Sequence, residues 1–209
     1  MVIVLAAALG FLYRFWFLRM PERHIPQLDN IFVSPANGTV SGIQKWSGDT
    51  AVIEKNLRSA VPAFTGSVGD SGYIVSIVML ISDVHYQRAP IKCRLVKKIY
   101  SPGLFDSATR RVNKYGVRFG NESNQMLFET ERGTRFKVIQ IAGLLARKIV
   151  DYIEPGQQMK QGDIIGLIRF GSQVTLILPA NVELRVKEGD VVVDGETIIA
   201  EEILLPLTE

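Results

Sequence analysis

The sequence predicts a mainly β protein with minor α content, built as a barrel-sandwich-like core with an N-terminal hydrophobic anchor. From Ile31 onward, short runs of β-branched and aromatic residues alternate with Gly, Pro, Asn and Asp, as is typical of strands joined by turns. Paired glycine turns recur near the C-terminus. An uncharged apolar stretch opens the chain. Together these features favour one β domain preceded by an anchor.

The opening stretch, residues 1–13, carries no charge and is rich in Leu, Val, Ala and Phe. Arg14 and Arg19 interrupt it before it reaches the roughly 20 apolar residues of a comfortable membrane span. Aromatic residues that favour a membrane interface lie at Tyr13, Phe15, Trp16 and Phe17. We expect residues 1–20 to form a membrane anchor whose basic end faces the cytoplasm, and the sequence leaves open whether it spans or only inserts.

Two other interpretations of this stretch fit less well. A cleaved signal peptide would have a basic region before the apolar run and a small-residue cleavage site after it, and neither is evident. A buried core helix would show a polar stripe, which residues 1–13 lack.

The remainder, residues 21–209, is expected to form the single folded domain. A chain of 209 residues with 47% hydrophobic content can bury a substantial core. The clearest helix candidate lies between Ser107 and Tyr115, and the apolar run 141–146 is too short to assign from periodicity. The clearest strand-like runs are residues 39–43, 73–78 and 174–178.

The glycine turns form an internal sequence repeat. Gly156 and Gly162 are six positions apart, and Gly189 and Gly195 repeat that separation. An acidic residue and a short apolar run follow the second glycine of each pair. Such units resemble the strands of biotinyl and lipoyl carrier domains. Neither copy presents a modifiable lysine at a hairpin tip, so the resemblance implies the scaffold without the carrier function.

Composition narrows the function classes. A net charge of +3 and a pI near 9.0 are too mild to indicate a nucleic-acid binder, although they suit an approach to an anionic lipid surface. Cys93 is the only cysteine, which excludes an internal disulfide and a cysteine-based metal centre held by this chain alone. His24 and His85 are the only histidines, so no metal site is expected.

Gly171-Ser172 is the dipeptide with the most specific chemical potential. A serine hydroxyl can attack the carbonyl of a preceding glycine, because glycine has no side chain to obstruct the approach and tolerates strained dihedrals. The resulting ester can eliminate, and hydrolysis then leaves a pyruvoyl group at residue 172. Such a terminal ketone can capture an amine substrate. Gly-Ser pairs are also common in ordinary turns, so the surrounding residues must distinguish a cleavage site from a turn.

The surrounding residues are specific. The stretch 160–172, Lys-Gln-Gly-Asp-Ile-Ile-Gly-Leu-Ile-Arg-Phe-Gly-Ser, resembles the processing site of phosphatidylserine decarboxylases of the short, archaeal-type subfamily. Three further segments resemble motifs of the same family and occur in the same order along the chain. They are residues 17–23, residues 34–38 with 83–90, and residues 121–124 with 140–147. The resemblance extends from about residue 15 to the C-terminus, and several ordered motifs are more specific than one.

This resemblance implies a pyruvoyl-dependent decarboxylase of phospholipid biosynthesis, which converts phosphatidylserine to phosphatidylethanolamine and carbon dioxide. It implies cleavage at Gly171-Ser172 into a beta chain, residues 1–171, and an alpha chain, residues 172–209, which stay together as a heterodimer. Further oligomerisation is left open. The expected location is the cell membrane, with the catalytic domain in the cytoplasm and no nucleic-acid partner.

The resemblance also assigns roles to residues. Ser172 would be the nucleophile of maturation and then the pyruvoyl residue, and His85 would transfer protons at the serine or at the substrate. By position, Arg88 and Arg169 are the candidates for binding the substrate phosphate or carboxylate. A lipid-facing basic face is expected from Arg110, Arg111, Lys114 and Arg118.

Two departures from the family pattern bear on the mechanism. Arg88 stands where longer members carry a second histidine, and Asn37 stands where relatives commonly have an aspartate that orients the histidine. The chain could process without this carboxylate, Asp83 could replace it, or Asn37-Gly38 could deamidate. The purely structural interpretation of Asn37-Gly38 is a turn.

Two alternative functions stay open at this point. An archaetidylserine decarboxylase would act on the same headgroup carried by ether-linked tails. A non-catalytic, membrane-tethered homologue would never cut itself, and Asn37 in place of aspartate is the feature that favours it.

Overall fold

The computed structural model describes residues 1–56, 59–102, 118–119, 121–143, 149–169 and 172–203. The chain begins with helix α1 (Val2–Phe11), which continues as a π-helical segment, η1 (Leu12–Phe17). The strands are β1 (Ile31–Val33), β2 (Gly38–Ser47), β3 (Thr50–Asn56), β4 (Ser59–Phe64), β5 (Ser71–Met79), β6 (Tyr86–Arg88), β7 (Cys93–Ser101), β8 (Arg118–Phe119), β9 (Ser123–Thr130), β10 (Arg135–Ala142), β11 (Ile149–Asp151), β12 (Gln158–Met159), β13 (Ile164–Ile168), β14 (Ser172–Pro179), β15 (Val182–Leu184), β16 (Val191–Val192) and β17 (Ile198–Glu202).

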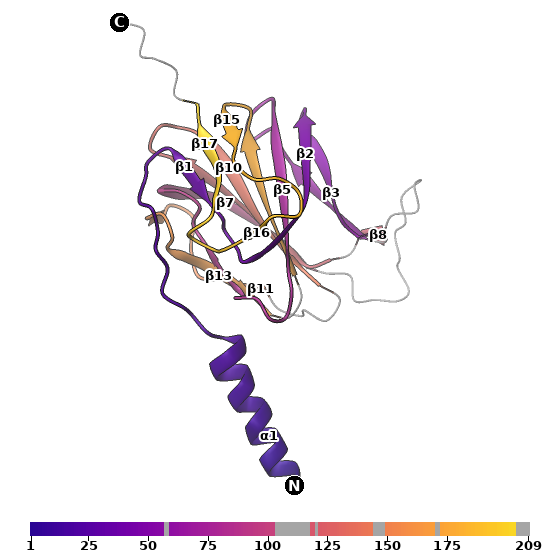
Figure 1. Cartoon of the computed structure of the whole chain (residues 1–209). Helices are drawn as coiled ribbons and strands as arrows, with labels where there is room; N and C mark the ends of the chain where they lie inside the picture. Colours follow the sequence, from indigo (N-terminus) through magenta and orange to yellow (C-terminus); the bar gives the residue numbers. More distant parts are fainter. Residues whose placement is uncertain (57–58, 103–117, 120, 144–148, 170–171, 204–209) are drawn as a thin grey trace, which may run out of the picture.

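The described strands form one large sheet and three small ones (Figure 1). The large sheet has the order β12-β7-β9-β10-β14-β5-β2-β16, and its neighbours pair antiparallel. The small sheets have the orders β1-β17-β15, β11-β13-β6 and β3-β4-β8. The prediction of a mainly β protein is confirmed, and these sheets stay open rather than closing into a barrel.

Strand β14 runs through the middle of the large sheet, and all of its residues are buried. Val174, Leu176 and Leu178 pack into a core that also contains the stacked rings of Phe128 and Phe136. Ile177 belongs to a second core, which includes Ile53 and Val61 of the hairpin β3–β4. Because both faces of the strand are covered, the consecutive residues Leu176 to Leu178 are all apolar and do not alternate with polar ones.

The predicted repetition of glycine turns is confirmed. Gly156, Gly162, Gly189 and Gly195 all have positive φ, at 93°, 87°, 90° and 77°. Two of these turns share one construction. The amide of Lys160 donates to Asp163 Oδ2 at 2.7 Å, and the amide of Lys187 donates to Asp190 Oδ2 at 2.9 Å.

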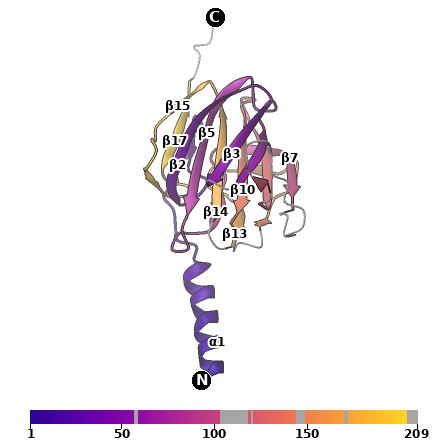
Figure 2. The same cartoon turned by 90° about the vertical axis from the view of Figure 1, so that its right-hand side faces the viewer.

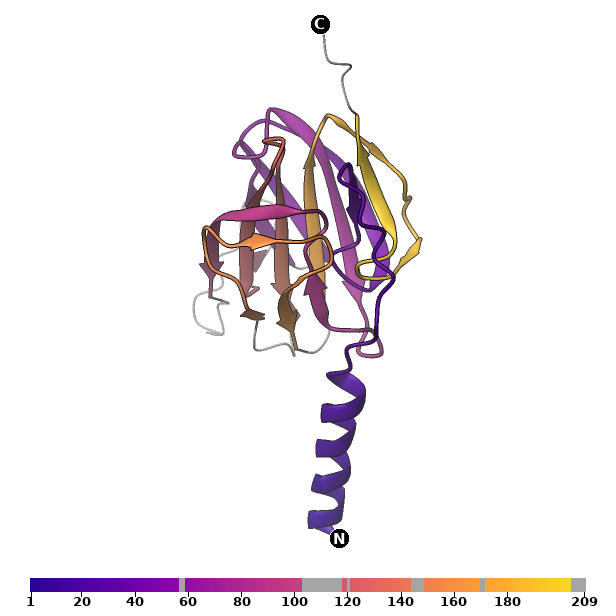
Figure 3. The same cartoon turned by 90° about the vertical axis from the view of Figure 1, so that its left-hand side faces the viewer.

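Helix α1 projects from one end of the β body, as three views show (Figures 1, 2 and 3). Its described side chains are exposed, whereas Phe17 at the end of η1 is buried. Within the described ranges, no helix is both long enough and apolar enough to cross a bilayer. The predicted helix 107–115 lies outside the described residues, as do residues 144–146, while Ile141 and Ala142 belong to β10.

The fold brings three strand ends together at the end of the body near α1. Ser172, the first residue of β14, pairs with Ala142 at the end of β10 and with Met79 at the end of β5. His85 follows β5 and immediately precedes β6. The main motifs singled out in the sequence therefore come together where these central strands of the large sheet end.

Substituting Gly72, in β5, tests how tightly β14 is held. A Cβ atom at Gly72 would collide with the carbonyl oxygen of Leu178, which is backbone and cannot swing away. We expect Gly72→Ala to lower the free energy of unfolding by about 2 kcal/mol, because overpacking forces the backbone to shift. At Gly42, the nearest atom to an added Cβ is a side-chain oxygen at 3.9 Å, so Gly42→Ala should cost much less. Urea unfolding of both variants checks this, and equal losses would contradict it.

Candidate active site

Ser172 lies buried at the start of β14, with 3% of its surface exposed. Its hydroxyl donates to the thioether sulfur of Met79, with Oγ and Sδ 3.3 Å apart. A thioether is a weak acceptor, so this contact does little to hold the proton of the hydroxyl. Phe170 and Gly171, the other members of the predicted cleavage motif, lie outside the described residues.

His85 is completely buried, and its ring lies 4.1 Å from the ring of Phe17. Nδ1 lies 2.8 Å from the carbonyl oxygen of Asp83. Because a carbonyl only accepts hydrogen bonds, the neutral ring carries its proton on Nδ1, which leaves a lone pair on Nε2. Nε2 is buried and has no hydrogen-bond partner among the described residues.

Burial lowers the pKa of His85 below its ordinary value of 6.5, and the hydrogen bond and charge of Asp83 oppose this only in part. The ring is therefore neutral at physiological pH. A neutral imidazole with a free Nε2 lone pair is the form that can accept a proton from a hydroxyl.

Asp83 orients His85 through its backbone and not through its carboxylate. The carboxylate oxygen Oδ2 accepts a hydrogen bond from the amide of Leu80 at 2.7 Å. One explanation considered for Asn37 was that the carboxylate of Asp83 orients the histidine instead. The structure shows that the backbone carbonyl of Asp83 orients His85.

Asn37 lies in a bend directly before β2, and its side chain forms hydrogen bonds with Asp194 and Arg23. Oδ1 accepts from the amide of Asp194 at 2.9 Å and from Arg23 at 3.2 Å. The next residue, Gly38, has φ of 145° and lies against the carbonyl of Val78. These contacts favour the structural interpretation of Asn37-Gly38, and deamidation stays a prediction.

Arg88 is held in a buried charge cluster that the sequence analysis did not identify. Its Nε donates to Asp194 Oδ2 at 2.7 Å, and its Nη1 donates to the carbonyl of Gly162 at 2.9 Å. Arg23 pairs with the other carboxylate oxygen of Asp194 at 2.5 Å. Asp194 is completely buried and both arginine side chains are 11% exposed. The predicted binding of substrate by Arg88 stays a prediction, because these contacts are all internal.

Arg169 differs from Arg88 in having a buried guanidinium nitrogen that is unpaired among the described residues. Its Nε is buried without a partner in the part of the chain that the structure describes. The residue directly follows β13, whose last residue, Ile168, donates its amide to the carbonyl of His85 at 3.2 Å. Arg169 is therefore a neighbour of His85, and its unpaired donor suits a carboxylate or phosphate oxygen.

A buried amide network connects Ser172, through Met79, with the backbone carbonyl of His85, and the sequence analysis did not assign it a role. Gln87 Nε2 donates to the carbonyl of His85 at 2.7 Å and contacts Met79 Sδ at 3.8 Å. The same sulfur accepts from Ser172. Gln87 Oε1 in turn accepts from Gln140 Nε2 at 2.8 Å, and Gln140 Oε1 accepts from Asn124 at 3.1 Å.

The signal for this network is weak but present in the sequence. Gln140 and Asn124 are direct cross-strand partners in β10 and β9, and Gln140 interrupts the apolar run from Val138 to Ala142. A buried amide in such a position must find hydrogen-bond partners. Which partners it finds depends on strand register, which the sequence did not reveal.

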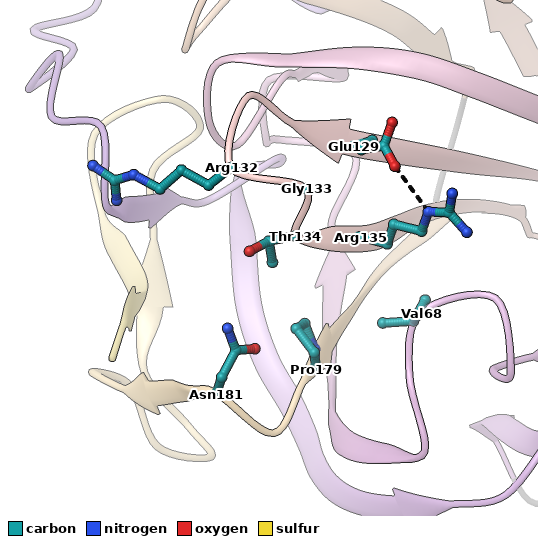
Figure 4. Close-up of a pocket in the computed structure, with 8 residues that line it drawn as sticks. All are labelled: Val68, Glu129, Arg132, Gly133, Thr134, Arg135, Pro179 and Asn181. Carbon is teal, nitrogen blue, oxygen red and sulfur yellow. Dashed lines mark hydrogen bonds and ion pairs between the residues drawn. The ribbon is translucent and has the colours of Figure 1, made fainter. Parts of the chain in front are cut away.

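A cavity of about 480 Å³ lies elsewhere, at the other end of β14 (Figure 4). It is lined in part by Pro179, which is roughly 23 Å along the strand from Ser172. Its arginines are engaged, since Arg135 pairs with Glu129 at 3.0 Å and Arg132 pairs with Glu202 at 3.3 Å. The cavity is therefore distant from Ser172, and its arginines already have carboxylate partners.

The buried charge cluster predicts a large effect of Asp194→Asn. Removing the carboxylate charge leaves two nearly buried guanidinium groups without a counter-ion, so the free energy of unfolding should fall by roughly 3–5 kcal/mol. Glu131→Gln is the matched control, because Glu131 and its partner Lys92 are both largely exposed. Urea unfolding measures both, and a control that loses as much stability as Asp194→Asn would contradict this assignment.

The lowered pKa of His85 predicts a pH-dependent stability. Between that pKa and 6.5, the unfolded chain binds a proton that the folded chain does not, so stability falls as pH drops through this window and levels off below it. Urea unfolding at several pH values should show a steeper loss for the parent than for His85→Gln. Equal losses in both proteins would show that His85 does not titrate abnormally.

Comparison with known proteins identifies the family of this chain. The family model described as phosphatidylserine decarboxylase matches residues 11–200. A phosphatidylserine decarboxylase proenzyme of Geotalea uraniireducens is 38% identical over 188 residues, which cover 90% of this chain and 78% of that protein. Proteins of the same name from Saccharopolyspora erythraea and Rickettsia akari are 40% and 35% identical over 89% and 92% of this chain, and over 72% and 78% of their own lengths. This chain belongs to the phosphatidylserine decarboxylase family.

Proposed function

We propose that this protein is a proenzyme that cuts itself between Gly171 and Ser172 and then decarboxylates phosphatidylserine to phosphatidylethanolamine and carbon dioxide. One observation carries the proposal. The buried hydroxyl of Ser172 is joined through Met79 and Gln87 to the backbone carbonyl of His85, a buried residue whose imidazole has a free Nε2 among the described residues, in a chain of this family. The name proenzyme, borne by the relatives, is consistent with maturation by cleavage.

In the maturation, Ser172 Oγ attacks the carbonyl carbon of Gly171 and the peptide nitrogen leaves, so that an ester replaces the amide. Elimination of the ester releases Gly171 as a carboxylate and leaves dehydroalanine at residue 172. One water then hydrolyses the dehydroalanine, which releases ammonia and leaves the pyruvoyl group.

His85 is suited to start this sequence. The hydroxyl of Ser172 must lose its proton as it attacks, and its present partner, the thioether of Met79, cannot accept that proton. His85 Nε2 has a free lone pair, and the carbonyl of Asp83 fixes the ring by holding Nδ1–H. The bond from Gln87 to the carbonyl of His85 further fixes this segment.

A pyruvoyl group at residue 172 fits the residues that surround it. The position is buried, and pairing with β5 and β10 holds the backbone from both sides. The group supplies a carbonyl that captures the substrate amine and withdraws electrons as carbon dioxide leaves.

The chain's own residues bind and position the substrate. Arg169 offers a buried, unpaired donor to the substrate carboxylate or phosphate. The ring of Phe17 covers His85 and excludes water from it, which keeps the imidazole neutral and its proton transfers local.

The two products of cleavage would remain one folded unit. Residues 172–209 contain β14, which pairs along its length with β5 and over six residues with β10. They also contain β17 and β16, which pair with β1 and β2 of the larger piece. Separating the pieces would break the middle of the large sheet, so a heterodimer is expected.

The same proposal locates the protein at the cell membrane, with its domain in the cytoplasm. The exposed apolar surface of α1 and the aromatic residues that follow it support attachment of residues 1–20 to a bilayer. An ether-linked archaetidylserine has the same headgroup and is the alternative substrate. The non-catalytic alternative loses support, because the relatives are named phosphatidylserine decarboxylase proenzymes.

Ser172→Ala tests the proposal directly. Intact-mass measurement should find the parent as two chains, residues 1–171 and 172–209, and the variant as one chain of 23.3 kDa. Carbon dioxide release from phosphatidylserine should fall to background in the variant. Ser76→Ala, another buried serine of the same sheet, is the matched control and should be cut like the parent. An uncut parent that still decarboxylates would overturn the mechanism.

A further inference from the structure

We propose that the loop formed by residues 80–82, between β5 and His85, is a second membrane-contact element that inserts Leu80 and Ile81 into the surface of an anionic bilayer beside the N-terminal helix. This inference deepens the proposed function, since it states how the site meets a lipid substrate. It assigns a binding role to a segment that the sequence analysis left without one.

The loop exposes two adjacent large apolar side chains. Leu80 is 64% exposed and Ile81 is 50% exposed, although they directly follow β5, whose neighbouring residue Met79 is buried. Single exposed apolar residues are common on protein surfaces, but a contiguous apolar patch indicates a contact surface. Phe15, Trp16 and Met20 of the N-terminal segment are exposed as well.

Arg19 joins the loop to the N-terminal segment. Its Nη2 donates to the carbonyl of Ser82 at 2.5 Å, and its Nη1 donates to the carbonyl of Trp16 at 2.8 Å. Its guanidinium also lies over the Trp16 ring, 5.3 Å from the centroid. In Figures 1 and 3, the loop that follows β5 lies at the end of the body from which the helix projects. The two apolar elements therefore form one face.

The loop is built to display these side chains. The carboxylate of Asp83 accepts from the amide of Leu80, and the carbonyl of Leu80 accepts from the amide of Asp83 at 3.0 Å. The turn thus satisfies two backbone polar groups internally, which reduces the cost of moving it out of water.

The occupant that fits this face is a lipid surface rather than a protein. Helix α1 carries no charged side chain and has no polar stripe, whereas a helix that docks on a protein keeps a polar face toward water. Arg14 and Arg19 stand at the aromatic end of the segment, and no acidic residue precedes Glu22. Basic residues next to interfacial aromatics match the headgroups of an anionic bilayer.

This contact would bring the site to the lipid. Ile81 is four residues from His85, a distance of at most about 14 Å along an extended chain. Phe17 joins the same segment to the site, because its ring packs on the His85 ring. A headgroup would then reach Ser172 with a short displacement out of the bilayer.

A fluorescence experiment tests insertion of the loop. Cys93 is buried and burial raises its pKa, so it reacts poorly and an introduced cysteine can be labelled selectively. Ile81→Cys carries an environment-sensitive fluorophore, and Ile203→Cys, 52% exposed beyond the far end of β17, is the matched control. With vesicles of phosphatidylcholine and phosphatidylglycerol, emission should shift to the blue at residue 81 and not at 203. No shift at residue 81 would overturn the inference.

A binding and turnover experiment separates the loop from the chemistry. The double variant Leu80→Ser, Ile81→Ser should bind the same vesicles about tenfold more weakly than the parent or Ile203→Ser, because two apolar side chains no longer enter the bilayer. Its self-cleavage, and its turnover of a short-chain phosphatidylserine dispersed as monomers, should stay unchanged. Its turnover of phosphatidylserine in vesicles should fall about tenfold.

The outcomes distinguish the two proposals. If the parent decarboxylates vesicle phosphatidylserine and the double variant binds and reacts equally well, the loop inference is wrong. If the parent binds vesicles through the loop but decarboxylates no lipid, the proposed function is wrong and the loop inference holds. A lipid-free dimer that the double variant abolishes would assign the face to a second copy of the chain and overturn the inference.

Discussion

The pairing of β14 with β5 on one side and β10 on the other is the constraint on which the rest of the structure depends. The two hydrophobic cores cover both faces of the strand, and the pairing fixes Ser172 beside Met79, where β5 ends. The position of His85 follows from this, since the chain leaves β5 at Met79 and needs only a short loop to return as β6. Ser172 is thus held by the sheet itself, and His85 by a short loop between two strands.

The buried cluster around Asp194 ties the N-terminal segment to the same body. Arg23 and Arg88 share its carboxylate, and the backbone of His24 donates to Glu196 Oε1 at 2.9 Å. The path from α1 along the domain is therefore fixed by charges and hydrogen bonds and not by apolar packing alone. Phe17 reaches His85 from that fixed path, which links the apolar helix to the chemistry.

Much of the fold and part of the site could be predicted from the sequence. The β class followed from local patterns, and the glycine turns followed from spacing because positive φ favours glycine. Ser172 and His85 stand out because their motifs are local. The ion pair of Arg23 with Asp194 joins residues 171 positions apart, and the contact of Gln87 with Gln140 depends on how distant strands meet. Such contacts are set by tertiary register, which one sequence does not reveal.

If the chain is cut before β14 as we propose, the central place of this strand changes the molecularity of folding. Before the cut, a denatured molecule refolds from one polypeptide. After it, the sheet can re-form only when two separate pieces meet, so recovery after heating depends on concentration. Thermal damage that the precursor would reverse on cooling becomes, for the dilute mature protein, close to permanent.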